Sequence, residues 1–242
     1  MHPKDTRGSI ALTLRALAHL LNYPDAGRRA QMDALVEALD REAALGVSRL
    51  AELGRLIGAL GTDDPYASEA RYIETFDRGR STSLHLFEHV HGDSRERGPA
   101  LVDLARTYEQ AGLYLDEGEL PDFLPVVLEF ASTQPPAQAV AFIGEFVHIL
   151  NAIHSALSQR RSPYAVVFAA LVELAGEPVR AVAIEPEVDL DDAWREPDAF
   201  GGCSSAGQSR PDAVQPVHLV RTPRSSTQPA QPPQSHIGAR QS

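Results

Sequence analysis

The 242-residue chain has almost no cysteine and lacks the common sequence signatures of catalysis. Cys203 is the only cysteine, which excludes an internal disulfide and a cysteine-rich zinc or iron–sulfur site. The sequence contains neither G-x-x-x-x-G-K-[ST] nor a G-x-G-x-x-G after a strand, and it has no G-x-S-x-G elbow. The sequence therefore contains no recognisable phosphate-binding loop and no residue that a motif identifies as a catalytic nucleophile.

The sequence also lacks an apolar run long enough to cross a membrane. The N-terminal stretch MHPKDTRGSIALTLRALAHLLNYP is interrupted by Arg15 and His19, and it has no small-residue cleavage site. We therefore expect no stable membrane insertion and a cytoplasmic location.

The charge of the chain limits its partners. A formal net charge of −11 argues against nonspecific binding to nucleic acid or anionic lipid, because an acidic surface repels their phosphates. A basic or partly cationic partner fits better. Residues 201–242 are rich in Pro, Ser, Gln and Gly and hold four arginines but one acid, so the remainder is more acidic than the whole. This composition predicts a disordered tail over 201–242 after a helical domain over 1–200.

Hydrophobic residues recur at helical spacing through the first three quarters of the chain. Ile10, Leu14, Leu17 and Leu21 step by four, three and four, and Asp64-Pro65 is typical of a helix start. Similar patterns cover 32–39, 50–60, 84–90, 101–108, 136–159 and 163–176. No comparable stretch alternates with period two, and no Asn-Gly or Asp-Gly turn separates two candidate strands. The predicted fold is all-α, a single compact helical bundle.

Three histidines form the most enzyme-like cluster, in the stretch SLHLFEHVHGD. His85 and His89 are four residues apart, a spacing that can place two zinc ligands on one helix face, and His91 follows closely. The order is not H-E-x-x-H, and spacing identifies no third ligand elsewhere. A metal-dependent helical enzyme or sensor using these histidines is thus the alternative hypothesis, beside ordinary surface or core histidines.

Three blocks together carry a family resemblance. They are YIETFDRGRSTSLHLFEHVHGDSRERG (72–98), ELPDFLPVVLEFAS (119–132) and WREPDAFGGC (194–203). In this order they resemble the delta subunit of respiratory nitrate reductase, which is the molybdenum-cofactor assembly chaperone of the catalytic subunit. The resemblance implies an all-helical, non-enzymatic protein without a cofactor of its own. Its implied partner is the N-terminal segment of the catalytic (alpha) subunit, bound before membrane docking while the client receives its cofactor.

The first two blocks supply the candidate client-binding residues. In the wider chaperone group the acid of the second block is commonly followed by histidine, but Phe123 follows Asp122 here, so a role that needs the histidine is not carried over. For the acidic and basic members of the first block, a capped, salt-bridged connection between helices is the competing interpretation. The candidates are Tyr72, Phe76, Asp77, His91, Asp93, Arg95, Glu119, Asp122, Phe123 and Val127.

The segment ELPDFLP places two prolines at the head of an apolar run. Pro121 fits the first turn of a helix, with Asp122 at its positive end, and Pro125 is early enough to cost little. Behind them, Phe123, Val127, Leu128 and Phe130 occupy more than one helix face. Two interpretations stay open: all four belong to the core, or some line a groove for an amphipathic client helix with acids on its rim.

Overall fold

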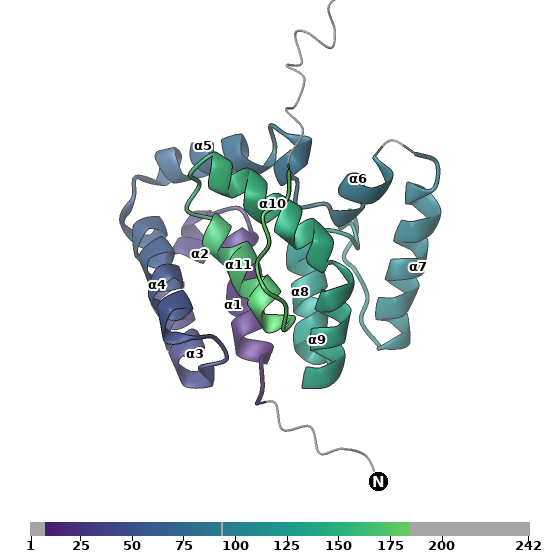
Figure 1. Ribbon diagram of the computed structural model, residues 1–242, viewed down its shortest axis with the longest axis horizontal. Coiled ribbons are helices and arrows are strands. Elements are labelled where there is room, and N and C mark those ends of the chain that lie inside the picture. Colours follow the sequence, from purple (N-terminus) through teal and green to yellow (C-terminus); the bar gives the residue numbers. More distant parts are fainter. Residues whose placement is uncertain (1–7, 93, 184–242) are drawn as a thin grey trace, which may run out of the picture. The chain divides into compact units, whose positions relative to one another are not determined.

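The computed structural model describes residues 8–92 and 94–183, and this part of the chain is helical (Figure 1). It contains no β-strand and a single isolated bridge, between His85 and Phe123. The predicted all-α class is confirmed. The helices are α1 (Ala11–Leu21), α2 (Ala26–Arg29), α3 (Met32–Glu42), α4 (Val47–Thr62), α5 (Pro65–Phe76), the 3-10 helix η1 (Arg80–Thr82), α6 (Leu86–His91), α7 (Arg97–Gln110), α8 (Leu124–Thr133), α9 (Pro136–Glu145), α10 (Val147–Gln159) and α11 (Ala165–Leu174).

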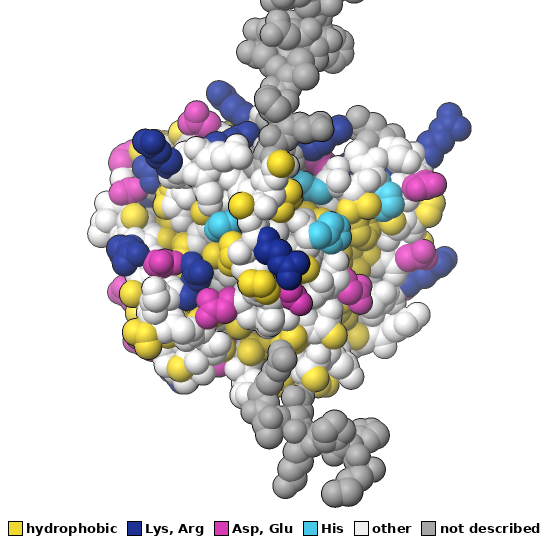
Figure 2. Space-filling model, viewed as in Figure 1, with side chains coloured by type: hydrophobic (Ala, Val, Ile, Leu, Met, Phe, Trp, Pro, Cys, Tyr) yellow, Lys and Arg dark blue, Asp and Glu magenta, His cyan; other side chains and the backbone are white. Residues whose placement is uncertain are grey.

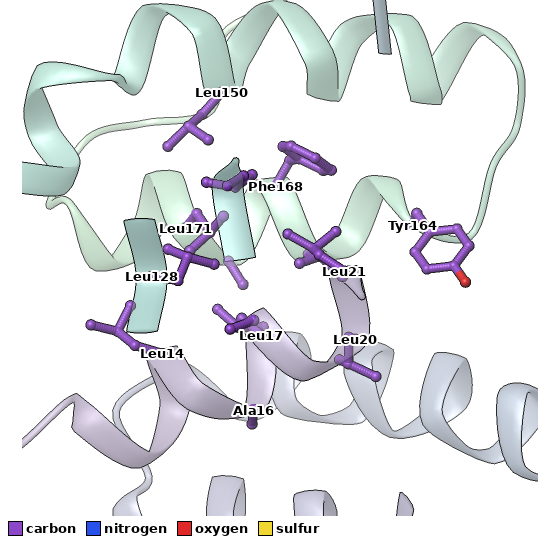
Figure 3. Close-up of a cluster of buried hydrophobic side chains, with 14 of the residues drawn as sticks. Leu14, Ala16, Leu17, Leu20, Leu21, Leu128, Leu150, Tyr164, Phe168 and Leu171 are labelled. Carbon is purple, nitrogen blue, oxygen red and sulfur yellow. The ribbon is translucent and has the colours of Figure 1, made fainter. Parts of the chain in front are cut away.

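The main core forms where α1 packs against α8 and α10 packs against α11. The heptad-like spacing of α1 buries Leu14, Leu17 and Leu21 completely. Figure 3 shows Leu17 and Leu21 directed toward Phe168 and Leu171 of α11. These side chains fill one contiguous hydrophobic cluster that also takes in α3, α4 and α5. Burial of this apolar surface is the dominant stabilising contribution to the fold.

Local signals fixed several helix ends as the sequence predicted. The side chain of Asp64 accepts a hydrogen bond from the Ala67 N–H at 3.0 Å, and Pro65 occupies the first turn of α5. After α7, Gly112 has φ +81°, the left-handed conformation that a helix-terminating glycine adopts readily. The periodicity did not indicate the four-residue helix α2 or the 3-10 helix η1.

The pattern over 136–159 is divided between two helices rather than forming one. α9 and α10 meet at Phe146 with a bend of 64°. Gly144 weakens the helix just before the break, and the Phe146 side chain is buried with its ring centroid 5.5 Å from that of Phe142. Hydrophobic periodicity continues across the break because both helices bury an apolar stripe, so periodicity alone did not reveal it.

α7 belongs to a smaller hydrophobic cluster at one side of the fold (Figure 1). Its buried members are Leu104 and Tyr108 of α7 and Phe130 of α8. The rings of Tyr108 and Phe130 lie 4.5 Å apart between centroids. The cluster attaches α7 to the main body through few apolar side chains.

Across residues 8–92 and 94–183, no single helix has both the length and the apolar character needed to span a bilayer. The bent pair α9 and α10 meets the criterion only when the two helices are taken together.

Candidate functional site

The first two sequence blocks meet at a short backbone junction. The Leu86 N–H donates to the Asp122 carbonyl at 3.0 Å, and the Leu124 N–H donates to the Leu84 carbonyl at 2.8 Å. The rings of His85 and Phe123 lie above this junction with centroids 5.3 Å apart. Segments nearly forty residues apart are therefore held in a fixed register by main-chain hydrogen bonds.

The Asp122 side chain is fully buried at this junction. One carboxylate oxygen accepts the Phe87 N–H at 3.1 Å and lies 3.7 Å from Nη2 of Arg97, and the other lies 3.4 Å from Nδ1 of His85. Asp122 thus caps the N-terminus of α6, a helix from the other block. The expected helix start at Pro121 is wrong: α8 begins at Leu124, with Pro125 in its first turn. Asp122 lies outside that helix because its carboxylate serves α6 instead.

Arg97 extends this network to α7. Its Nη1 atom lies 3.2 Å from Oε1 of Glu88, and Oε2 of Glu88 accepts a hydrogen bond from the Ser83 hydroxyl at 2.6 Å. The Ser83 carbonyl in turn lies 2.9 Å from Nε2 of His89. Burial lowers the pKa of His89, which favours the neutral ring. The network therefore fixes η1, α6 and the start of α7 together.

The histidines do not form a metal centre in this geometry. α6 begins at Leu86, so His85 precedes the helix and faces Asp122, whereas His89 binds the Ser83 carbonyl. The His91 ring packs against Phe87 at 5.7 Å between centroids. Over the part of the chain that the structure describes, no three His, Cys, Asp or Glu side chains gather as a metal site.

The ten predicted client-binding residues divide by burial. Tyr72, Phe76, Asp122 and Val127 are buried, and His91 and Phe123 are half-buried. Asp77, Arg95 and Glu119 are exposed, and Asp93 lies outside the described residues. A client could touch the four buried side chains only after the chain rearranged. Their role in binding stays a prediction that this geometry does not favour.

Tyr72 and Phe76 have an evident structural role. The Tyr72 hydroxyl donates to the Leu21 carbonyl at 2.8 Å, which ties α5 to the end of α1. The Tyr72 and Phe76 rings pack against Tyr164 with centroids 6.4 and 4.9 Å away. Burial raises the pKa of Tyr72, so its hydroxyl remains a hydrogen-bond donor. These aromatics fill the core between α1, α5 and α11.

A groove of about 440 Å³ lies between α1, α2, α8 and the segment after α7. Figure 2 shows the face of the molecule on which α10 and α11 lie nearest the viewer in Figure 1, where hydrophobic side chains lie among acidic, basic and histidine side chains. Of the ten predicted residues, only Glu119 lines the groove. Phe130, one of the four apolar residues that the sequence offered as core or groove, lines it as well, and sequence reasoning missed the rest because separate segments contribute to the groove. The lining is Arg15, His19, Arg28, Tyr108, Leu113, Tyr114, Leu115, Glu119, Val126, Glu129, Phe130, Ser132 and Thr133.

Two carboxylates stand in this groove without a cationic partner among the described residues. Glu119 accepts a 3.4 Å hydrogen bond from the Asp116 N–H, and neither it nor Glu129 has a cation within 4.0 Å there. Partial shielding of the carboxylate from water and the nearby charge of Glu119 raise the pKa of Glu129, whereas Arg28, Arg15 and His19 act in the opposite direction. Within the groove, Arg28 also pairs with Asp25 at 3.5 Å and Arg15 donates to the Ser132 hydroxyl at 3.1 Å.

The described part of the chain has an all-helical fold. It is similar to the crystal structure described as a redox enzyme maturation protein from Archaeoglobus fulgidus, with a TM-score of 0.51 and 19% identity over 73% of this chain and 100% of that chain. A family model described as nitrate reductase delta subunit matches residues 25–170. The chain belongs to the nitrate reductase delta subunit family.

Curated relatives in this family carry a consistent name. The chain is 40% identical over 195 residues to the nitrate reductase molybdenum cofactor assembly chaperone NarJ of Escherichia coli K12, covering 76% of this chain and 83% of the relative. A Bacillus subtilis protein with the same description is 35% identical over 157 residues, covering 64% of this chain and 83% of that protein. These are assembly chaperones rather than catalysts. The predicted family is confirmed, and the alternative of a metal-dependent enzyme is not supported.

Proposed function

We propose that this chain is the molybdenum-cofactor assembly chaperone of a respiratory nitrate reductase. Its partner is the catalytic (alpha) subunit, and it binds that subunit's N-terminal segment in the groove between α1, α8 and residues 113–119. The names of its relatives in Escherichia coli and Bacillus subtilis support the chaperone role. The choice of subunit, segment and groove, and a cytoplasmic location, belong to the proposal.

The observation that carries the groove assignment is Glu129. The Glu129 side chain is exposed at the groove, its pKa is raised, and no cation lies within 4.0 Å of its carboxylate among the described residues. A basic side chain of a bound client would supply the missing partner and strengthen the ionised form. Glu119 stands in the same groove and reinforces the preference for a cation.

The apolar part of the groove suits a client helix. Leu113, Leu115 and Val126 are partly buried against the α7 cluster, and Tyr114 is 79% exposed. A helix with an apolar face and basic residues would bury surface on these side chains while placing a cation near the carboxylates. Phe130 closes the groove floor and connects it to the ring of Tyr108.

The experiment is calorimetric titration of the full chain with a synthetic peptide of the client's N-terminal segment. We expect Glu129→Gln to weaken binding about tenfold, because the variant loses a charge pair that the bound client would shield from water. Glu37→Gln is the matched control, because Glu37 is exposed on α3 and lies outside the groove. A Val126→Asp variant should weaken binding as well, through the apolar contact.

The proposal has a defined failure. If Glu129→Gln and Val126→Asp both fold and both bind the peptide as the wild type does, the groove is not the client site. If the wild-type chain does not bind the peptide at all, the N-terminal segment is not the recognised part. Co-purification with the catalytic subunit from the native host tests the partner independently of either result.

A further inference from the structure

A second concave surface, of about 660 Å³, lies on the C-terminal half of α5 and the turn between α10 and α11. It shares no lining residue with the groove between α1, α8 and residues 113–119, which we call the client groove because we propose that the client binds there. We call it the arginine concavity, after four of its lining residues. Its lining is Arg71, Glu74, Thr75, Arg78, Arg160, Arg161, Ser162 and Pro163.

The four arginines differ in what holds them. Arg71 is paired with Asp63, with 2.8 Å between Nη1 and Oδ2. Arg160 donates to the hydroxyls of Ser81 and Thr82 at 3.2 and 3.4 Å, which orient its guanidinium group. Within residues 8–92 and 94–183, Arg78 and Arg161 make no ion pair with a carboxylate. Two guanidinium groups therefore face this concavity without a counter-ion from the described chain.

The C-termini of two helices explain part of this gathering of arginines, but not all of it. α5 ends at Phe76 and α10 at Gln159, and each C-terminus carries roughly half an elementary negative charge that favours nearby cations. Glu74 adds one more negative charge to the lining. Even so, four guanidinium groups line one hollow of a chain whose net charge is −11, and they come from α5 and the residues that follow α5 and α10, segments about eighty residues apart.

The position of Arg161 is a second unusual feature. Its φ of +53° lies in the left-handed region, which glycine adopts with less strain than a residue that carries a side chain. Its N–H donates to the Ser158 carbonyl at 3.0 Å and the Ser162 N–H donates to the Leu157 carbonyl at 2.9 Å, which closes α10. Glycine would satisfy this turn with less strain, so the turn itself does not require an arginine.

From this arrangement we propose that the arginine concavity binds a diphosphate-bearing small molecule. Guanidinium groups match phosphate oxygens bidentately, and several of them converging on one hollow favour a multivalent anion over a single carboxylate. The hollow has the volume of a small-molecule site rather than the flat surface of a protein interface. Ser162 and Thr75 add hydroxyl groups to the same lining.

The test titrates the full chain with inorganic pyrophosphate, inorganic phosphate and adenosine diphosphate at low ionic strength. We expect saturable binding at one site, with pyrophosphate bound more tightly than phosphate. Equal affinity for pyrophosphate and adenosine diphosphate supports recognition of the diphosphate alone. Tighter binding of the nucleotide also supports the site and assigns the difference to the remaining lining.

Variants locate the binding. Arg78→Gln with Arg161→Gln should weaken pyrophosphate binding at least about tenfold. The control Arg55→Gln with Arg106→Gln removes the same net charge from two exposed arginines outside the concavity and should stay within about twofold. Glu74→Gln should tighten binding about threefold or more, because it removes the negative charge from the lining.

Three outcomes would overturn the site. The first is a wild-type chain that does not bind pyrophosphate. The second is equal weakening by the two double variants, which would show a nonspecific charge effect. The third is a polyglutamate peptide that binds more tightly than pyrophosphate, which would make the concavity a docking surface for an acidic protein segment. The Arg78→Gln and Arg161→Gln double variant should bind the client peptide with wild-type affinity. The pyrophosphate test of the arginine concavity can therefore fail without affecting the peptide test of the client groove.

Discussion

The two sides of the helical body differ in how they are held together. α1 buries seven of its eleven residues in the main core, whereas α7 buries two of its fourteen. α7 is attached instead through polar contacts at its ends, where Arg97 meets Glu88 and Asp122 and the Tyr108 hydroxyl donates to the Pro121 carbonyl at 2.8 Å. Few buried apolar contacts and more polar ones characterise a region of lower local stability.

This difference in packing between the α1 side and the α7 side bears on where the client is proposed to bind. The client groove lies where the α7 side joins α1 and α8, so one wall belongs to the densely packed core and the other to the thinner region. A wall with low local stability can adjust to a ligand while the core keeps the opposite wall fixed. The predictions below test this contrast between the two sides, from the largest expected effect to the smallest.

Truncation of a leucine should cost most in the main core. Leu128 is completely buried on α8, and Leu128→Ala should lower the free energy of unfolding by about 4 kcal/mol. Leu104 is 8% exposed in the small cluster, and Leu104→Ala should cost about 2 kcal/mol because that region can relax around the cavity. Urea unfolding of both variants measures the difference. Equal costs would show that α7 is packed as firmly as the core.

Removal of the Asp122 carboxylate should come next in size. Asp122→Ala leaves the Phe87 N–H without its acceptor and Arg97 with Glu88 alone, and we expect a loss of about 3 kcal/mol in the free energy of unfolding. Asp122→Asn should cost less, because the amide oxygen can still accept the Phe87 N–H. Asp103→Ala is the control, since Asp103 is exposed on α7.

Client affinity distinguishes this structural role from a direct contact. Because Asp122 is fully buried, the folded fraction of Asp122→Asn should bind the client peptide with wild-type affinity. A loss of affinity in a fully folded Asp122→Asn preparation would show instead that the acid faces the client, as the family resemblance suggested.

Two buried tyrosines offer a finer comparison of the same regions. Tyr108→Phe removes the hydrogen bond to the Pro121 carbonyl and should cost about 1 kcal/mol. The Tyr164 hydroxyl is buried in the main core and has no hydrogen-bond partner among the described residues. Tyr164→Phe should therefore be neutral or slightly stabilising. Thermal melts of the two variants would contradict this if Tyr164→Phe proved the more damaging.

The sequence was informative where the determinants are local. The start of α5 follows from Asp64 and Pro65, which act within one helical turn, and the end of α7 follows from Gly112. The amphipathic spacing of α1 identified its buried face for the same reason: neighbours three and four residues apart share a helix face.

Determinants that act over long range were not visible in the sequence. The acid that caps α6 comes from Asp122, thirty-five residues beyond the N–H that it accepts. The break at Phe146 depends on the core available to its ring, which periodicity does not report. The client groove draws on four segments, and Glu129 differs from other glutamates only through its surroundings. The family resemblance suggested Glu119, which lines the groove proposed for the client, and also aromatic residues that the structure places in the core.

The smallest expected effect is the pH dependence that His89 contributes to the stability of the α6 region. Burial lowers the pKa of His89, although the Ser83 carbonyl and Glu88 oppose that shift. The unfolded chain therefore binds this proton more readily than the folded chain. The stability due to the neutral ring is complete above the unfolded pKa of about 6.5 and is lost as the pH falls below it.

His89→Gln should accordingly flatten the fall in stability between about pH 7 and pH 5, with little change in slope above that range. Burial lowers the pKa of His154 as well, so a part of the wild-type slope should persist in the variant. Chemical denaturation at a series of pH values measures both slopes. If the free energy of unfolding depends on pH with the same slope in the wild type and in His89→Gln, the α6 region opens easily. Water then reaches His89 at a small cost in free energy. In that case the α7 side of the molecule would be looser than its hydrogen bonds to Asp122 and Pro121 indicate.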